Sequence, residues 1–225
     1  AGPVALQYFA AGLNVFILRY SVKENALNDA PLIESALAVK HIRENADRYF
    51  VDPDYIFITG FSAGGHCAAM CGTLWNHPVV REALGIDRGE APEGINRPTA
   101  TVLCYPVITA NPFAHRGSID TLCGYPSEDT DGAYHFSVEL HVDKTTAPAF
   151  IWHTAADGLV PVWCSLALGQ ALSEHDVGYE MHIFPNGPHG MALAKNDPVV
   201  GKWTDIIAVS TSGSHTVGLR KDGTV

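Results

Sequence analysis

The sequence predicts an α/β fold built on a doubly wound, mostly parallel β-sheet, with a short β-hairpin-like segment at its C-terminal end. Apolar strand patterns alternate with helical patterns along most of the chain, which is typical of a parallel sheet covered on both faces. A serine flanked by glycines stands directly between one such strand and the following helix. After about residue 201 the pattern changes to short alternating strands with a hairpin-turn signal at Asp222-Gly223. We therefore expect an α/β domain over residues 1–201 and a separate segment over residues 202–225.

The first part of the chain predicts a helix, a strand and a longer helix. Apolar residues at helical spacing predict a helix over residues 3–11. The continuous apolar run over residues 14–20 predicts a strand that is buried on both faces. A longer helix begins near Pro31 and ends before residue 52. The later elements are, by the same patterns, strands over residues 55–59, 100–105, 148–153 and 179–184 and helices over residues 64–75 and 162–173.

Two stretches interrupt this alternation. Residues 76–99 are rich in proline, glycine and charge, and we expect a surface loop there. Residues 107–147 lack long apolar runs, and we expect an insertion or cap over one end of the sheet. Its His135 and His141 are expected to face solvent or a substrate. Its aromatic residues fit either a substrate pocket or a small core of the insertion itself: Phe113, Tyr125, Tyr134 and Phe136.

Composition and charge exclude several classes of protein. The chain has 225 residues, of which 47% are hydrophobic and 17% charged, so it can form a globular core. Its formal net charge of −10 provides no basic surface for nucleic acid or for an anionic membrane. No apolar run approaches the ~20 residues that cross a bilayer. The five cysteines form an odd, widely spaced set, which favours reduced core thiols over a disulfide-stapled secreted domain.

The motif Gly60-Phe61-Ser62-Ala63-Gly64, followed by Gly65, carries the strongest functional signal. It lies directly after an apolar strand and directly before a helix, which is the setting of a serine nucleophile on a sharp turn. We expect Gly60 and Gly64 to be required because such a turn leaves no room for a Cβ. The turn would raise the Ser62 hydroxyl above the sheet and point the Ala63 backbone N–H at the oxygen of the reacting carbonyl. A glycine-serine loop without catalysis is the alternative interpretation.

A serine nucleophile needs a base and an orienting acid, and the sequence offers both in the expected order. Asp157 follows the strand over residues 148–153, and His189 follows the strand over residues 179–184. Both therefore belong to loops at the carboxyl ends of strands, where the loops of an α/β sheet converge. Taken alone, Asp157 is equally well explained as a carboxylate favoured near a helix N-terminus.

These motifs resemble the α/β-hydrolase superfamily, in particular its bacterial branch related to acetyl-xylan and feruloyl esterases. The similar segments are residues 11–21, 60–66, 152–157 and 184–189, so the resemblance covers about residues 1–200. It implies a serine esterase that needs no metal or organic cofactor, with Ser62 as nucleophile, Asp157 as orienting acid and His189 as general base. It also implies an ester of a small molecule or of a plant carbohydrate, acetyl or hydroxycinnamoyl, as substrate.

The start of the chain departs from this family. The family's first strands and its glycine-rich oxyanion loop, a His-Gly-Gly-Gly or Pro-Gly-Gly-Gly run, would precede residue 1, so we expect an N-terminally truncated chain. Loss of one oxyanion donor typically costs about 10²–10³-fold in turnover, so we expect these residues alone to be weakly active or inactive. The start carries no initiator Met and no targeting pattern. The compartment stays open, with the cytoplasm favoured.

The end of the chain departs from the family as well. Residues 203–225 resemble part of one repeat of the bacterial propellers related to regulator-of-chromosome-condensation proteins. A single repeat cannot bury its own faces, so a truncated fusion, an artificial join or a chance hairpin would each explain it. A helix over residues 199–207 that closes the hydrolase is the competing expectation.

Other functions stay open at this stage. A serine peptidase of the prolyl-oligopeptidase type shares the Gly-x-Ser-x-Gly-Gly turn and the Asp-x-x-Val-Pro loop, but its propeller precedes the hydrolase. A scaffold protein with an inactive hydrolase domain is a further possibility. Cys67 and Cys71, beside His66, have no second ligand pair, so we expect packing thiols and no metal site. We expect no nucleic-acid or membrane partner, and the sequence leaves the oligomeric state open.

Overall fold

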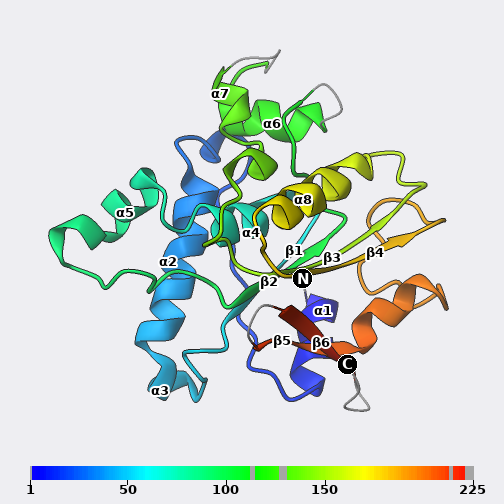
Figure 1. The fold of residues 1–225 in the computed structure, drawn as a ribbon, viewed down its shortest axis with the longest axis horizontal. Helices are drawn as coiled ribbons and strands as arrows, with labels where there is room; N and C mark the ends of the chain where they lie inside the picture. Colours follow the sequence, from blue (N-terminus) through cyan, green and yellow to red (C-terminus); the bar gives the residue numbers. More distant parts are fainter. Residues whose placement is uncertain (1, 112–114, 127–130, 213–214, 221–225) are drawn as a thin grey trace.

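A four-stranded parallel sheet forms the centre of the molecule (Figure 1). The computed structural model describes residues 2–111, 115–126, 131–212 and 215–220. The strands follow one another across the sheet in chain order: β1 (Phe57–Phe61), β2 (Ala100–Cys104), β3 (Ala149–Thr154) and β4 (Tyr179–Phe184). Each neighbouring pair is parallel, which confirms the predicted fold class. The register places Phe61 beside Cys104 and Cys104 beside Trp152, so the carboxyl ends of these strands lie together.

Helices cover both faces of the sheet (Figure 1). Along β3, Ile151 packs against the first face, and Phe150 and Trp152 pack against the second, because successive side chains of a strand point in opposite directions. All six residues of β3 are buried, which explains why its sequence is apolar nearly throughout. The first face carries α2 (Ala30–Glu44), α4 (Ala63–Thr73) and α8 (Trp163–Glu174), and the second carries α1 (Gly2–Ala10) and the 3-10 helix η4 (Val200–Asp205).

Residues 14–20 do not form the predicted strand. Among the described residues no strand pairs with them, and their apolar side chains are largely exposed, Ile17 to 55%. An apolar run becomes a stable strand only where a neighbouring ladder takes up its N–H and C=O groups. This segment is held by isolated contacts instead, among them the hydrogen bond from Asn14 Nδ2 to the Phe50 carbonyl (3.1 Å). Two short helices, η1 (Lys23–Asn25) and α3 (Ala46–Tyr49), flank α2 in the chain.

Residues 76–99 are only partly loop, so that prediction was wrong over two segments. They contain α5 (Pro78–Leu84) and the 3-10 helix η2 (Ile86–Arg88). The His77 side chain caps α5 by accepting a hydrogen bond from a first-turn backbone N–H, and Gly85 ends it with φ of +71°. These are ordinary start and stop signals. A helix of seven residues is too short to display the apolar periodicity on which the prediction relied.

The described part of residues 107–147 contains three short helices at one end of the molecule (Figure 1). They are α6 (Arg116–Cys123), α7 (Asp131–Tyr134) and the 3-10 helix η3 (Val138–His141). Phe136 is buried in the same core cluster as Ile119, which favours the core interpretation for this aromatic residue. Tyr125 and Tyr134 are exposed. Phe113 lies outside the described residues.

The last described elements are η4 and an antiparallel pair of strands, β5 (Ile206–Ser212) and β6 (His215–Arg220), which lies close to β4. The expected closing helix over residues 199–207 is met in part, because helical structure reaches Asp205 and the hairpin follows at once. The resemblance to a propeller repeat stays a prediction. Trp203 is buried and stacks on Trp152, with ring centroids 5.4 Å apart. Residues 222–223, with the predicted turn, lie outside the described part. None of the helices in that part is long and apolar enough to span a bilayer.

Candidate active site

Ser62 stands on a sharp turn between β1 and α4. Its φ of +56° lies in the region that residues with a Cβ rarely adopt. The Ser62 N–H donates to the Cys104 carbonyl (3.0 Å), and the Ser62 carbonyl accepts from the Val107 N–H (3.2 Å). The end of β2 and the segment after it therefore hold Ser62 in its strained backbone conformation. Such a conformation persists only where the surrounding structure supports it with several contacts.

The glycines around Ser62 differ in how much room they leave. A Cβ on Gly60 would overlap the Gly64 carbonyl and lie 2.7 Å from the Gly65 nitrogen. A Cβ on Gly65 would lie 2.8 Å from the Pro106 Cβ. At Gly64 a Cβ would meet only the Tyr20 hydroxyl at 3.5 Å, an ordinary van der Waals contact. The steric expectation is therefore confirmed for Gly60 and wrong for Gly64, and Gly65 is the second crowded position.

A continuous chain of hydrogen bonds connects Ser62, His189 and Asp157. The His189 Nε2 is 2.8 Å from the Ser62 Oγ, and the His189 Nδ1 is 2.7 Å from the Asp157 Oδ2. A carboxylate only accepts, so the Nδ1 carries the proton and the Nε2 can accept the serine hydroxyl. The His189 side chain is 15% exposed and the Asp157 side chain is fully covered. This arrangement can activate a serine hydroxyl for attack on a carbonyl carbon.

Backbone groups hold the second oxygen of the Asp157 carboxylate. The N–H groups of Leu159 and Val160 donate to Oδ1 at 2.9 and 3.0 Å. Burial opposes ionisation of this carboxyl, but the hydrogen bonds from His189 and from these two N–H groups outweigh it, so its pKa lies below the ordinary value. Asp157 is therefore a carboxylate, and not a carboxylic acid, at neutral pH.

Ala63 is the first residue of α4, as a backbone oxyanion donor next to the nucleophile should be. The first N–H groups of an α-helix have no acceptor within the helix, and the helix dipole places partial positive charge there. The Ala63 N–H thus belongs to a helix end that favours negative charge developing on a carbonyl oxygen.

The loop that carries His189 is fixed by two aromatic residues that were not among the predicted site residues. The Tyr105 hydroxyl accepts from the Ala192 N–H, and the Trp203 Nε1–H donates to the Ala192 carbonyl, both at 3.0 Å. The Tyr105 ring also meets the His189 ring edge-on, with centroids 4.9 Å apart. Tyr105 directly follows β2 with a φ of +39°. Its place at the carboxyl end of a predicted strand was the one signal that could have marked it.

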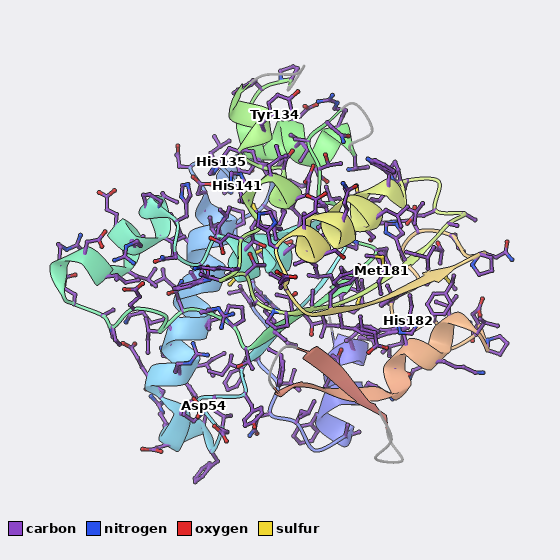
Figure 2. The ribbon with its side chains drawn as sticks, in the orientation of Figure 1. Asp54, Tyr134, His135, His141, Met181 and His182 are labelled. Carbon is purple, nitrogen blue, oxygen red and sulfur yellow. The ribbon has the colours of Figure 1, made fainter. Side chains whose placement is uncertain are left out.

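The histidines of the insertion are partly exposed and also form hydrogen bonds within the protein. That they face solvent or a substrate stays a prediction. Figure 2 shows His135 and His141 close together on the side of α7 and η3. The His135 Nε2 lies 2.7 Å from Asp29, and this hydrogen bond raises the pKa of His135. The His141 Nε2 donates to the His135 carbonyl (3.0 Å). Together they connect the insertion to the start of α2.

Cys67 and Cys71 are buried thiols, as predicted. Burial raises the pKa of Cys67 to about 12 and that of Cys71 to about 11. The neighbouring His66 donates from its Nε2 to the Phe136 carbonyl (2.8 Å) and is buried as well. In the part of the chain that the structure describes, no group of three or more His, Cys, Asp or Glu residues could hold a metal ion.

The parallel sheet and the serine turn at the end of β1 define this chain as an α/β-hydrolase. Within that class it belongs to the BD-FAE family, whose model matches residues 2–172. The crystal structure of an acetyl ester-xyloside bifunctional hydrolase from Caldicellulosiruptor lactoaceticus superposes with a TM-score of 0.78 at 35% identity. That similarity covers 90% of this chain and 72% of the other.

Two curated relatives are much longer than this chain. Endo-1,4-beta-xylanase B of Butyrivibrio fibrisolvens is 35% identical over 203 residues, which are 89% of this chain and 31% of the relative. The acetylxylan esterase of Xylanibacter ruminicola is 25% identical over 81% of this chain and 35% of its own length. The chain thus spans about a third of the length of each of these relatives.

Proposed function

We propose that this protein is a serine esterase that hydrolyses carboxylic esters through an acyl-serine intermediate. Ser62 is the nucleophile, His189 the general base and acid, and Asp157 the carboxylate that orients the imidazole. The observation that carries this proposal is the unbroken line of hydrogen bonds from the Ser62 Oγ through His189 to Asp157. A triad in this order acts by acyl transfer, and we propose no metal or organic cofactor for it.

The reaction would proceed in two half-reactions. The Ser62 Oγ attacks the acyl carbon while its proton passes to the His189 Nε2, and the Ala63 N–H donates to the carbonyl oxygen as negative charge develops on it. The ester C–O bond then breaks, and the His189 proton passes to the leaving alcohol. Water, activated by His189, attacks the acyl-serine and releases the carboxylic acid and free Ser62.

An acetylated or hydroxycinnamoylated plant carbohydrate is the proposed substrate. The acetylxylan esterase and the acetyl ester-xyloside hydrolase described above support the acetyl group and the xylan-type alcohol. We further propose that residues 1–201 form the catalytic unit, with residues 107–147 as its cap. Residues 202–225 are proposed to be part of a propeller-type repeat.

The test compares substrates on one purified protein. It should release nitrophenol from a short-chain nitrophenyl ester and acetate from acetylated xylan, and it should leave a proline-based amide intact. A fluorophosphonate probe should label wild-type protein and not the Ser62→Ala variant, because only an activated serine reacts. Cleavage of the amide at a comparable rate would favour a peptidase, and absence of labelling would favour a protein without catalysis.

A further inference from the structure

A second histidine contacts the acid of the proposed triad, and the proposed reaction gives it no task. His153 is near the end of β3 and is fully buried. Its Nε2 lies 3.2 Å from the Asp157 Oδ2 and 3.0 Å from the Val160 carbonyl oxygen. Its Nδ1 lies 2.8 Å from the Oγ of Ser165, which is also fully buried. All polar atoms of this ring therefore have partners inside the protein.

The partners of His153 determine where its proton is. The carboxylate and the carbonyl facing the Nε2 can only accept, so the Nε2 must carry the proton. The Nδ1 of the neutral ring is then an acceptor, and the Ser165 hydroxyl donates to it. Burial lowers the pKa of His153. The Asp157 carboxylate raises this pKa and His189 lowers it, but burial has the largest effect. The ring is thus a neutral donor with one fixed tautomer at neutral pH.

This donor closes the turn that holds Asp157. The Val160 N–H donates to the Asp157 Oδ1, and the Val160 carbonyl accepts from His153. The Asp157 Oδ2 accepts from His153 and from His189, at 3.2 and 2.7 Å. Both oxygens of the Asp157 carboxylate are consequently fixed. The Oδ2 therefore presents its acceptor lone pair to His189 in a single orientation.

We propose that His153 is a positioning residue for the orienting acid. It holds the Asp157 carboxylate at the angle that His189 requires, and Ser165 holds His153 in the donating tautomer. The proposal rests on the esterase function proposed above, because it assigns Asp157 the orienting role. A misplacement of about 1 Å in a catalytic group can cost about 10²-fold in rate, so the support of the acid matters for turnover.

The kinetic test compares His153→Phe with His153→Gln. Phenylalanine fills the space without a donor, whereas the glutamine amide can place an N–H near the position of the Nε2. We expect kcat to fall about 10- to 100-fold in His153→Phe with KM unchanged, and to recover by at least about fivefold in His153→Gln. His182→Phe is the matched control. His182, which Figure 2 labels on β4, bonds to Glu180 and not to Asp157. This variant should retain wild-type kcat.

Equal kcat in wild type and His153→Phe would overturn the proposal. So would equal losses in the phenylalanine and glutamine variants, since that result indicates packing alone. If His153→Phe does not fold, nitrogen-15 NMR of histidine-labelled wild-type protein still decides. The His153 ring should show a protonated Nε2 and a bare Nδ1 at pH 7, and its Nε2–H resonance should move in Asp157→Asn. A protonated Nδ1 would contradict the proposal. Wild-type protein without ester turnover would reject the esterase function itself and leave this spectrum unaffected.

Discussion

Ser62 and His189 share one hydrogen bond, so neither side chain can do its proposed work without the other. We expect Ser62→Ala and His189→Ala each to lower kcat by about 10⁴-fold or more, and the double variant to lose at most a further threefold or so. Steady-state kinetics with a nitrophenyl ester measure all three. Turnover of Ser62→Ala near the wild-type value would show that another group is the nucleophile.

Buried His66 gives the folded protein a sensitivity to acid. Burial lowers the pKa of His66 to about 4, whereas a histidine in the unfolded chain titrates near ~6.5. Between these values the unfolded state binds the proton and the folded state does not, so stability falls as the pH falls from about 6.5 toward 4. Between pH 7 and pH 5 this one group should cost about 2 kcal/mol of unfolding free energy.

Urea unfolding of wild type and His66→Gln at pH 7 and pH 5 isolates that contribution. Glutamine can still donate to the Phe136 carbonyl, but it does not titrate. The stability difference between the two proteins should therefore shift by about 2 kcal/mol in favour of the variant on going to pH 5. A pH-independent difference would mean that His66 titrates normally in the folded protein.

At the level of elements, the turn between β1 and α4 depends on Gly60. A Cβ there would collide with backbone atoms of α4, which cannot rotate away as a side chain could. Gly60→Ala should destabilise the protein by about 2 kcal/mol or more and abolish labelling of Ser62. Thermal unfolding and fluorophosphonate labelling measure the two effects.

Gly117 is the matched control for that variant. It is in α6, where its nearest contact would be the His115 ring at 3.8 Å, and alanine is the better helix former. Gly117→Ala should leave labelling and stability unchanged or slightly improved. If Gly60→Ala behaves like Gly117→Ala, the close approach of β1 and α4 is not required.

Strands and long helices were predictable because their apolar patterns report burial directly. The four strands of the sheet appear within two residues of their predicted bounds. The two central strands, β2 and β3, are buried along nearly their whole length, whereas β1 and β4 are only partly buried. Residues 14–20 have the same apolar pattern, but no described strand pairs with them. A strand forms only where a second segment supplies its hydrogen-bond partners, and the apolar sequence alone does not show whether such a segment is present. The short α5 was missed for the opposite reason, since caps and not periodicity define it.

The candidate site was predictable only where short sequence motifs mark the catalytic residues. Ser62 has its glycines, and Asp157 and His189 each follow a strand. Tyr105 bonds to Ala192, which lies 87 positions further along the chain, and the contact of His153 with Asp157 depends on the orientation of its ring. Neither residue belongs to a short motif, although Tyr105 stands at the end of a predicted strand. These contacts arise from packing, which a single sequence does not display.

At the scale of the whole molecule, we expect the C-terminal segment to support stability and turnover up to the end of η4, and the hairpin after it to contribute little to turnover. Trp203 packs into the core and bonds to the loop of His189, whereas β5 and β6 pair with each other. Deleting residues 210–225 should leave ester turnover within about twofold of wild type. Trp203→Ala should cost about 3–5 kcal/mol of unfolding free energy and lower turnover with it.

Kinetics and urea unfolding of both variants test this division. A selective loss of turnover in the deletion, with stability unchanged, would show that the hairpin takes part in the reaction. An unaffected Trp203→Ala would show that the loop of His189 does not need its support.

The bond between His189 and Ser62 joins residues 127 positions apart, and this separation has a consequence for folding. Closing so long a segment costs chain entropy that local contacts do not repay, so distant pairings tend to form late. During refolding from urea, helical circular dichroism should return before Ser62 becomes reactive toward the fluorophosphonate probe. Simultaneous recovery of the two signals would contradict this order. Reactivity of a single serine would thus report when the chain has completed its native topology, and not merely its secondary structure.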